Sequence, residues 1–232
     1  MKRILVLCVV ISISFSVVAQ RSLNLTDASV VKDTSGKVLA THEWKTIIAS
    51  GRYSLRTETP GGYDGPFIIR VLSDEEVKQR INNSPAPRVS PFFITGRKAM
   101  SFNARDLNGI NYKLKDLQGK IVVLNFWFIG CLPCRQEMPE LNKLADEYKD
   151  STNIVFLAIA LDEKTQVQSF LQKSPFHYNV ISDGQYIASM YGINSFPTHV
   201  VLDKAGKVLF HTTGYGAGTV PWVRKTVVGA MR

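Results

Sequence analysis

The sequence predicts an α/β fold over residues 92–232, preceded by a small α+β segment at 20–82. Three observations lead to this prediction. After Phe92, apolar runs of strand length alternate with stretches whose apolar residues recur at a helical period. The run at 120–129, KIVVLNFWFI, is a continuous apolar strand of the kind that is buried on both faces of a sheet. Finally, a predicted strand hairpin at 198–212 is followed by a closing helix at 219–231.

Between these landmarks, strands and helices alternate along the chain. The stretch DLNGINYKL at 106–114 predicts a hairpin turn before the apolar strand. A helix is expected directly after the cysteines. The shorter elements expected after it are a strand at 153–160, a helix at 165–173, a strand at 178–182 and a helix at 184–192.

The segment at 20–82 consists of short elements around little apolar sequence. The sequence Asp-x-x-Gly-Lys-Val-Leu occurs at 33–39 and again at 203–209. We interpret it as one hairpin turn used twice, with Gly at a positive φ, because nothing else in the two regions matches. Residues 83–91 hold three prolines and predict a linker. The other elements expected here are strands at 52–58 and 67–73, a helix capped by Thr41 that ends at Gly51, and a helix capped by Ser73 or Asp74.

Residues 1–19 have the pattern of a secretory signal peptide. Lys2 and Arg3 precede an apolar run, and small residues precede a predicted cleavage site after Ala19. A membrane anchor is the alternative, but it needs roughly 20 apolar residues and this run has about 15. We therefore expect an exported protein, periplasmic or otherwise extracytoplasmic, with no stable membrane insertion after cleavage.

Cleavage would change both the cysteine content and the charge. Loss of Cys8 leaves Cys131 and Cys134 as one pair in an oxidising compartment. Loss of Lys2 and Arg3 lowers the net charge from +9 to +7. The basic residues are scattered among acids rather than clustered with aromatic residues, so no nucleic-acid partner is expected.

The two cysteines are predicted to differ in exposure. Cys131 follows the apolar strand, and from Cys134 an apolar stripe runs through Met138, Leu141 and Ala145. This phase turns Cys134 toward the core and leaves Cys131 at the helix N-terminus, where unpaired N–H groups stabilise a thiolate. Cys131 is therefore the expected attacking nucleophile, and Cys134 the resolving thiol.

The cysteine pair could also bind zinc or form a static disulfide. A zinc site usually needs four ligands, and the histidines lie far from the pair in sequence, so no metal is expected. A static disulfide between residues so close would constrain little of the chain. The reactive pair is the favoured interpretation.

The stretch VVLNFWFIGCLPCRQEMPEL at 122–141 resembles the TlpA/ResA-like thiol-disulfide oxidoreductases of the thioredoxin superfamily, and the resemblance extends over 92–232. It implies a thioredoxin-like fold, with a central mixed sheet flanked by helices. Pro139 matches the family's helix-kinking proline, and SFPTHVVLD resembles its cis-proline loop. Pro197 is then the cis residue, and with Phe196 and Trp127 it is expected to contact the partner peptide.

The resemblance also bears on protonation and potential. Asn125 stands where cytosolic thioredoxins place a buried aspartate used for proton transfer, which an asparagine cannot perform. Glu137 is expected to lie near the cysteines and help move protons, although an acid that complements the helix dipole remains an alternative. Gly130 replaces the tryptophan that often precedes the first cysteine, and Leu132 replaces the glycine common in cytosolic thioredoxins. Because such residues influence the redox potential, the family's redox potential cannot be assigned to this protein.

The function expected is disulfide exchange with partner proteins, in the direction of a reductant, without any cofactor. The resemblance implies disulfide-containing protein substrates and a membrane reductase as electron donor. A peroxiredoxin-like thiol peroxidase is one alternative, but that chemistry favours a threonine where Phe128 stands. A non-enzymatic binding protein with a thioredoxin-like fold is the other.

Overall fold

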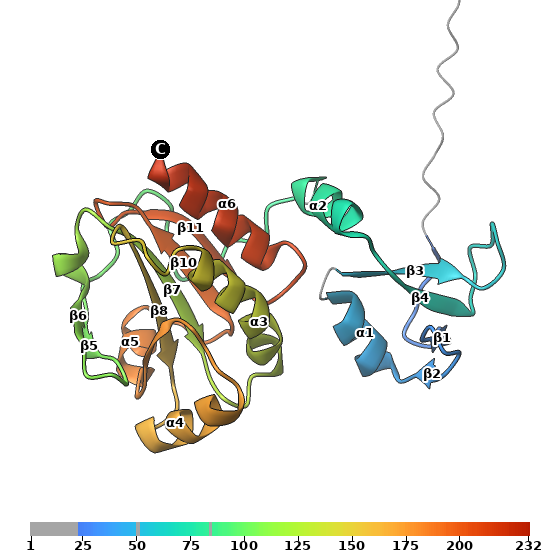
Figure 1. The fold of residues 1–232 in the computed structure, drawn as a ribbon, viewed down its shortest axis with the longest axis horizontal. Helices are drawn as coiled ribbons and strands as arrows, with labels where there is room; N and C mark the ends of the chain where they lie inside the picture. The colour runs from blue at the N-terminus through green and yellow to red at the C-terminus, as the bar shows by residue number, and fades with distance from the viewer. Residues whose placement is uncertain (1–22, 50–51, 84) are drawn as a thin grey trace, which may run out of the picture.

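The computed structural model describes residues 23–49, 52–83 and 85–232, which form a larger and a smaller folded region (Figure 1). The predicted signal peptide at 1–19, with Cys8, lies outside the described residues. Within them, no helix is both long and apolar enough to cross a membrane. The larger region is built on a five-stranded sheet of order β11-β10-β7-β8-β9, and the smaller on a four-stranded sheet of order β2-β1-β4-β3.

The five-stranded sheet is mixed, as the resemblance implied. The apolar strand β7 (Ile121–Trp127) lies at its centre, and all seven of its residues are buried. It pairs in parallel with β8 (Ile154–Ala160) and antiparallel with β10 (Thr198–Leu202). The edges are β9 (Asn179–Ile181), parallel to β8, and β11 (Val208–Thr213), antiparallel to β10.

Helices cover both faces of this sheet and create two cores. Alternate residues of β7 point to opposite faces, so Val123 and Trp127 contribute to one core and Leu124 and Phe126 to the other. Each such fully buried side chain stabilises the fold by roughly 1.5–3 kcal/mol. The first face packs against α3 (Leu132–Glu147), α4 (Lys164–Lys173) and α6 (Thr219–Met231). The second face packs against α5 (Gln185–Met190) and η1 (Leu114–Leu117). It also packs against the residues that precede the hairpin of β5 (Asn103–Arg105) and β6 (Asn111–Lys113).

The smaller region has a core of its own, formed by four buried side chains, Val31, Trp44, Phe67 and Ile69. Its first strand pairs antiparallel with the second and parallel with the fourth. The elements are β1 (Val31–Lys32), β2 (Val38–Leu39), α1 (Thr41–Ala49), β3 (Tyr53–Thr57), β4 (Phe67–Val71) and α2 (Asp74–Asn83).

The repeated hairpin motif is confirmed as shared turn chemistry. The carboxylates of Asp33 and Asp203 each accept hydrogen bonds from the backbone N–H groups two and four residues later. Asp106 does the same in the β5–β6 hairpin. The glycine three residues after each aspartate has a φ of 89°, 76° and 88°, respectively. Glycine adopts this conformation without the steric cost that a Cβ would add.

Two local expectations need adjustment. Thr41 is the first residue of α1 rather than its cap, and its hydroxyl donates to the Asp27 carbonyl. At α2, Ser73 is the cap: its hydroxyl accepts from the Glu76 N–H, and its own N–H donates to the Glu76 carboxylate.

The second half of the predicted linker is attached to the larger region rather than extended between the two. The Arg88 carbonyl accepts a hydrogen bond from the hydroxyl of Thr212 on β11. The Ser90 hydroxyl lies 3.1 Å from Nδ1 of the buried His211, also on β11. Residues 88–90 therefore run along the edge of the sheet.

Candidate functional site

Cys131 and Cys134 form a disulfide at the N-terminus of α3, with their Cα atoms 5.3 Å apart. Cys131 is the N-cap residue, and its sulfur accepts a hydrogen bond of 3.2 Å from the Cys134 N–H. Cys131 keeps 5% of its surface exposed and Cys134 keeps 1%. The order of exposure agrees with the prediction, although the sulfurs are more covered than a helix-terminal position alone suggests. Pro139 lies inside α3, as expected.

Two contacts fix the turn between β7 and the cysteines. The Asp162 carboxylate accepts a hydrogen bond of 2.7 Å from the Ile129 N–H. The ring of Phe128 packs edge-on against Phe196, with 5.4 Å between ring centroids. Leu132, between the cysteines, is 56% exposed. Leu132 therefore places an exposed apolar side chain beside the covered disulfide.

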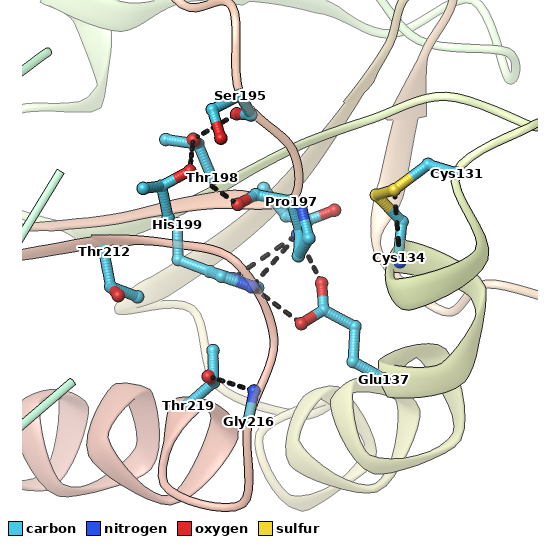
Figure 2. A network of polar contacts seen from close by, with 12 residues as sticks. Cys131, Cys134, Glu137, Ser195, Pro197, Thr198, His199, Thr212, Gly216 and Thr219 are labelled. Atoms are coloured by element: carbon cyan, nitrogen blue, oxygen red, sulfur yellow. Dashed lines mark hydrogen bonds and ion pairs between the residues drawn. A yellow bond between two sulfur atoms is a disulfide. The ribbon is translucent and has the colours of Figure 1, made fainter. Parts of the chain in front are cut away.

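The loop before β10 has the predicted cis proline. The Phe196–Pro197 peptide bond is cis. The Pro197 carbonyl accepts a hydrogen bond of 2.8 Å from the Gly214 N–H. The Thr198 hydroxyl donates to the Ser195 carbonyl (Figure 2). Within the described chain, neither the N–H nor the carbonyl of Phe196 has a hydrogen-bond partner. These two groups can pair with an added peptide strand.

Beneath the disulfide, three polar side chains meet in the core that faces α3. Asn125 and His199 are direct partners in the register of β7 and β10, so both point to the same face of the sheet. Asn125 Nδ2 donates to Glu137 Oε1 over 3.1 Å, and His199 Nε2 lies 3.0 Å from Glu137 Oε2 (Figure 2). Asn125 is 1% exposed, and the other two have no exposed surface.

Glu137 also belongs to the cysteine helix. Residues three apart on a helix are neighbours on its surface, so Glu137 lies one turn below Cys134 on the same face. Its carboxylate points from α3 toward the two strands (Figure 2).

Burial dominates the electrostatics around this carboxyl group. Burial raises the pKa of Glu137, while the charge of His199 and hydrogen bonds from His199 and Asn125 oppose that shift. Burial and the Glu137 charge raise the pKa of Tyr178 well above its ordinary value. Burial also raises the pKa of Tyr215, with smaller effects from Glu140 and Glu137. The network therefore favours the uncharged forms of the acids around it.

His199 is the site residue that the sequence did not reveal. It lies 74 residues from Asn125 and 62 from Glu137, so no local spacing connects it with either. The available signal was an imidazole two residues after the predicted cis proline, directly before the apolar residues Val200, Val201 and Leu202. Only the pairing of β10 with β7 brings this imidazole next to Asn125.

Trp127, expected at the partner surface, is instead wholly buried. Its ring packs against Phe170 and Phe176, with centroids 5.6 and 5.8 Å away. As an alternate residue of β7 it faces the α3 core, so it supports the helix from behind and cannot contact a partner directly. Among the described residues, no group of three or more His, Cys, Asp or Glu side chains is placed to hold a metal ion.

The thioredoxin-like region is similar to proteins of known family. A family model described as the AhpC/TSA family matches residues 95–211. Thiol-disulfide oxidoreductase ResA of Bacillus thuringiensis (strain Al Hakam) is 39% identical over 121 residues, covering 51% of this chain and 69% of that protein. Thioredoxin-like protein YneN of Bacillus subtilis (strain 168) is 36% identical over 115 residues, covering 49% and 68%.

A solved structure gives the same correspondence in three dimensions. A protein described as thiol:disulfide interchange protein DsbE, from Chlorobium tepidum, matches with a TM-score of 0.55 and 29% identity. The match covers 60% of this chain and 99% of that one.

Proposed function

The chain belongs to the AhpC/TSA family and to the ResA-like thiol-disulfide oxidoreductases of the thioredoxin superfamily, and we propose that it reduces disulfides in partner proteins outside the cytoplasm. The observation that supports this most strongly is the position of the disulfide. Cys131 caps α3 beside the Phe196–Pro197 loop, and Cys134 lies one turn later, above the buried Glu137. A nucleophile, a resolving thiol, a peptide-pairing edge and a proton acceptor thus meet in one place.

Reduction of a partner then has two steps. The Cys131 thiolate of the reduced protein attacks one sulfur of the partner disulfide; a mixed disulfide forms, and the partner's other sulfur leaves as a thiolate and takes up a proton. Cys134 next gives its proton to Glu137 and attacks the Cys131 sulfur. The Cys131–Cys134 bond forms, the mixed disulfide breaks, and the second partner thiolate is protonated. Two electrons have passed to the partner.

The proposed location rests on the sequence of the N-terminal residues, and the proposed reducing direction follows the resemblance to the ResA-like proteins. Residues 1–19 favour export, and an exported reductant must be supplied with electrons after each cycle. We propose a membrane reductase as the donor. Exposed apolar side chains beside the disulfide, such as Leu132, are suited to contacts with both donor and substrate.

The peroxidase alternative finds little support at the site. The position three residues before Cys131 is occupied by Phe128, whose ring packs on Phe196 and offers no hydroxyl to a peroxide. The second cysteine in the next turn favours disulfide exchange instead.

Turnover with two oxidants tests the proposal. Reduced protein should reduce the interchain disulfides of insulin and lose this activity on Cys131→Ser, while hydrogen peroxide is consumed no faster than by free thiols. A redox titration against glutathione should give a potential more negative than the glutathione couple. Rapid peroxide consumption without insulin reduction, or a strongly oxidising potential, would refute the assignment as a protein-disulfide reductase.

A further inference from the structure

His199 has no part in the exchange steps above, yet it is fully buried against the residue that takes the proton. A buried histidine can be purely structural. His211 on the neighbouring strand illustrates that case, because it contacts the Ser90 hydroxyl, lies beside the ring of Phe93 and meets no charged partner among the residues that the structure describes. His199 differs because its Nε2 atom lies 3.0 Å from a carboxylate oxygen that has no exposed surface.

We propose that His199 is a positioning residue for disulfide exchange, which shares one proton with Glu137 and so places a carboxyl group beside Cys134 without adding a net charge. The inference rests on the proposed function of the cysteine pair. A lone carboxylate with no exposed surface is very costly, and a neighbouring cation or a bound proton removes that cost. The cross-strand pairing of His199 with Asn125 fixes the imidazole opposite α3, and Asn125 holds the second carboxylate oxygen.

The shared proton explains how Glu137 can serve Cys134 in both directions. With the proton on His199, Glu137 is a carboxylate that accepts the Cys134 proton as this thiol attacks Cys131. The local charge is unchanged, because a thiolate and a protonated pair replace a thiol and a neutral pair. The extra proton then leaves for the departing partner thiolate. In the reverse reaction, the same pair returns a proton to Cys134.

Other titratable groups also face Glu137. Tyr178 lies just before β9 and Tyr215 precedes α6; each has a raised pKa, so both stay protonated near neutral pH. On α3, Glu140 has a pKa raised by burial, which the charges of Arg52, Lys143 and Arg224 oppose. Cys134 itself completes the set. Glu140 is therefore a carboxyl group whose titration could be confused with that of Glu137.

The test compares five variants of the full chain in the reduced state: His199→Gln, Glu137→Gln, the double variant, Glu140→Gln, and His211→Gln as matched control. Gln at 199 can donate the same hydrogen bond but cannot carry the proton. The readout is the rate of Cys131 alkylation by iodoacetamide between pH 5 and 10, with the modified residue identified by mass spectrometry. Glu140→Gln shows which features of the profile belong to that carboxyl group.

In the wild type, we expect a single titration that belongs to Cys131. In His199→Gln, Glu137 should titrate alone, adding a second step and raising the Cys131 midpoint by about one unit, a roughly tenfold loss of thiolate below it. The double variant should remove that step. His211→Gln should lower the melting temperature and leave the profile unchanged. A His199→Gln profile that matches the wild type, or a second step that persists in the double variant, would overturn the inference.

Wild-type protein provides a second measurement should His199→Gln fail to fold. In ¹³C-labelled protein, the Glu137 carboxyl resonance should show no titration of its own between pH 5 and 9, because the pair keeps one proton. An independent titration of that resonance, with the His199 ring unaffected, would contradict the shared proton. Either failure would leave insulin reduction by the wild type intact, whereas failure of the proposed function would abolish it.

Discussion

In residues 92–232 a carboxylate, an amide and an imidazole lie together with almost no exposed surface, whereas the ion pairs of residues 23–83 lie in solvent. The side chains of the Lys32–Glu58, Lys45–Asp27 and Arg70–Glu76 pairs are between 26% and 80% exposed. Exposed pairs add little to stability, since water competes for both partners. Burial of Glu137 costs free energy unless each oxygen has a partner, and Asn125 and His199 supply those partners.

Removing the buried carboxylate should have the largest effect. Glu137→Ala leaves Asn125 and His199 without their partner and opens a cavity, so we expect a loss of about 3–5 kcal/mol in the free energy of unfolding. Urea denaturation measures it. The matched change in the smaller region, Glu58→Ala, removes one partner of an exposed pair and should leave the midpoint nearly unchanged. Equal losses of unfolding free energy in the two variants would contradict the difference between the buried and the exposed carboxylate.

The pH dependence of stability should differ between the regions in sign. Because burial raises the pKa of Glu137, the folded protein keeps a proton that the unfolded chain has released. The contribution of Glu137 to the free energy of unfolding is fully present below about pH 4.5 and is lost as the pH rises through the raised pKa. The slope is at most about 1.4 kcal/mol per pH unit. The melting temperature of the wild type should therefore fall relative to that of Glu137→Gln as the pH rises. A wild-type melting temperature that rises relative to that of the variant over this range would contradict the raised pKa.

The smallest effect is expected at Glu76, in the smaller region. Hydrogen bonds from Arg70 and Ser73 lower the pKa of Glu76 to about 2. The lowered pKa has the opposite consequence for stability. The contribution of Glu76 to the free energy of unfolding is present above about pH 4.5 and disappears as the pH falls toward 2. Glu76→Gln should leave stability at pH 7 only slightly reduced and flatten the acid limb. Circular dichroism melts between pH 2 and 7 measure this, and a large loss at pH 7 would show that the pair is not solvent-screened.

Much of this fold follows from local sequence. The apolar run at 120–129 and the helix at 219–231 correspond to β7 and α6, since periodicity and turn residues determine such elements nearly alone. The Asp-x-x-Gly turns were predictable for the same reason. The parallel pairing of β1 with β4 was not, because it joins segments separated by a helix and two strands, and nothing local encodes it.

The site residues show the same contrast between what local sequence predicts and what only the folded sheet reveals. Cys131, Glu137 and Pro197 were each predicted from a short local motif, the first two from the cysteine motif and the third from the cis-proline loop, and the structure brings the two motifs together. His199 depends on the register of β10 against β7, which only the folded sheet supplies. Trp127 was placed wrongly because β7 is buried on both faces, so no pattern of alternation showed which way its ring points.

The most direct test of the account is to trap the mixed disulfide. Cys134→Ser and Cys131→Ser, each reduced, would be mixed with a disulfide-linked model peptide and digested for mass spectrometry. Cys134→Ser should accumulate one adduct, joined through the Cys131 sulfur, because the resolving thiol is missing; Cys131→Ser should accumulate almost none, because Cys134 is 1% exposed. Adducts that form as readily on Cys134 as on Cys131 would contradict the division of labour between the two cysteines.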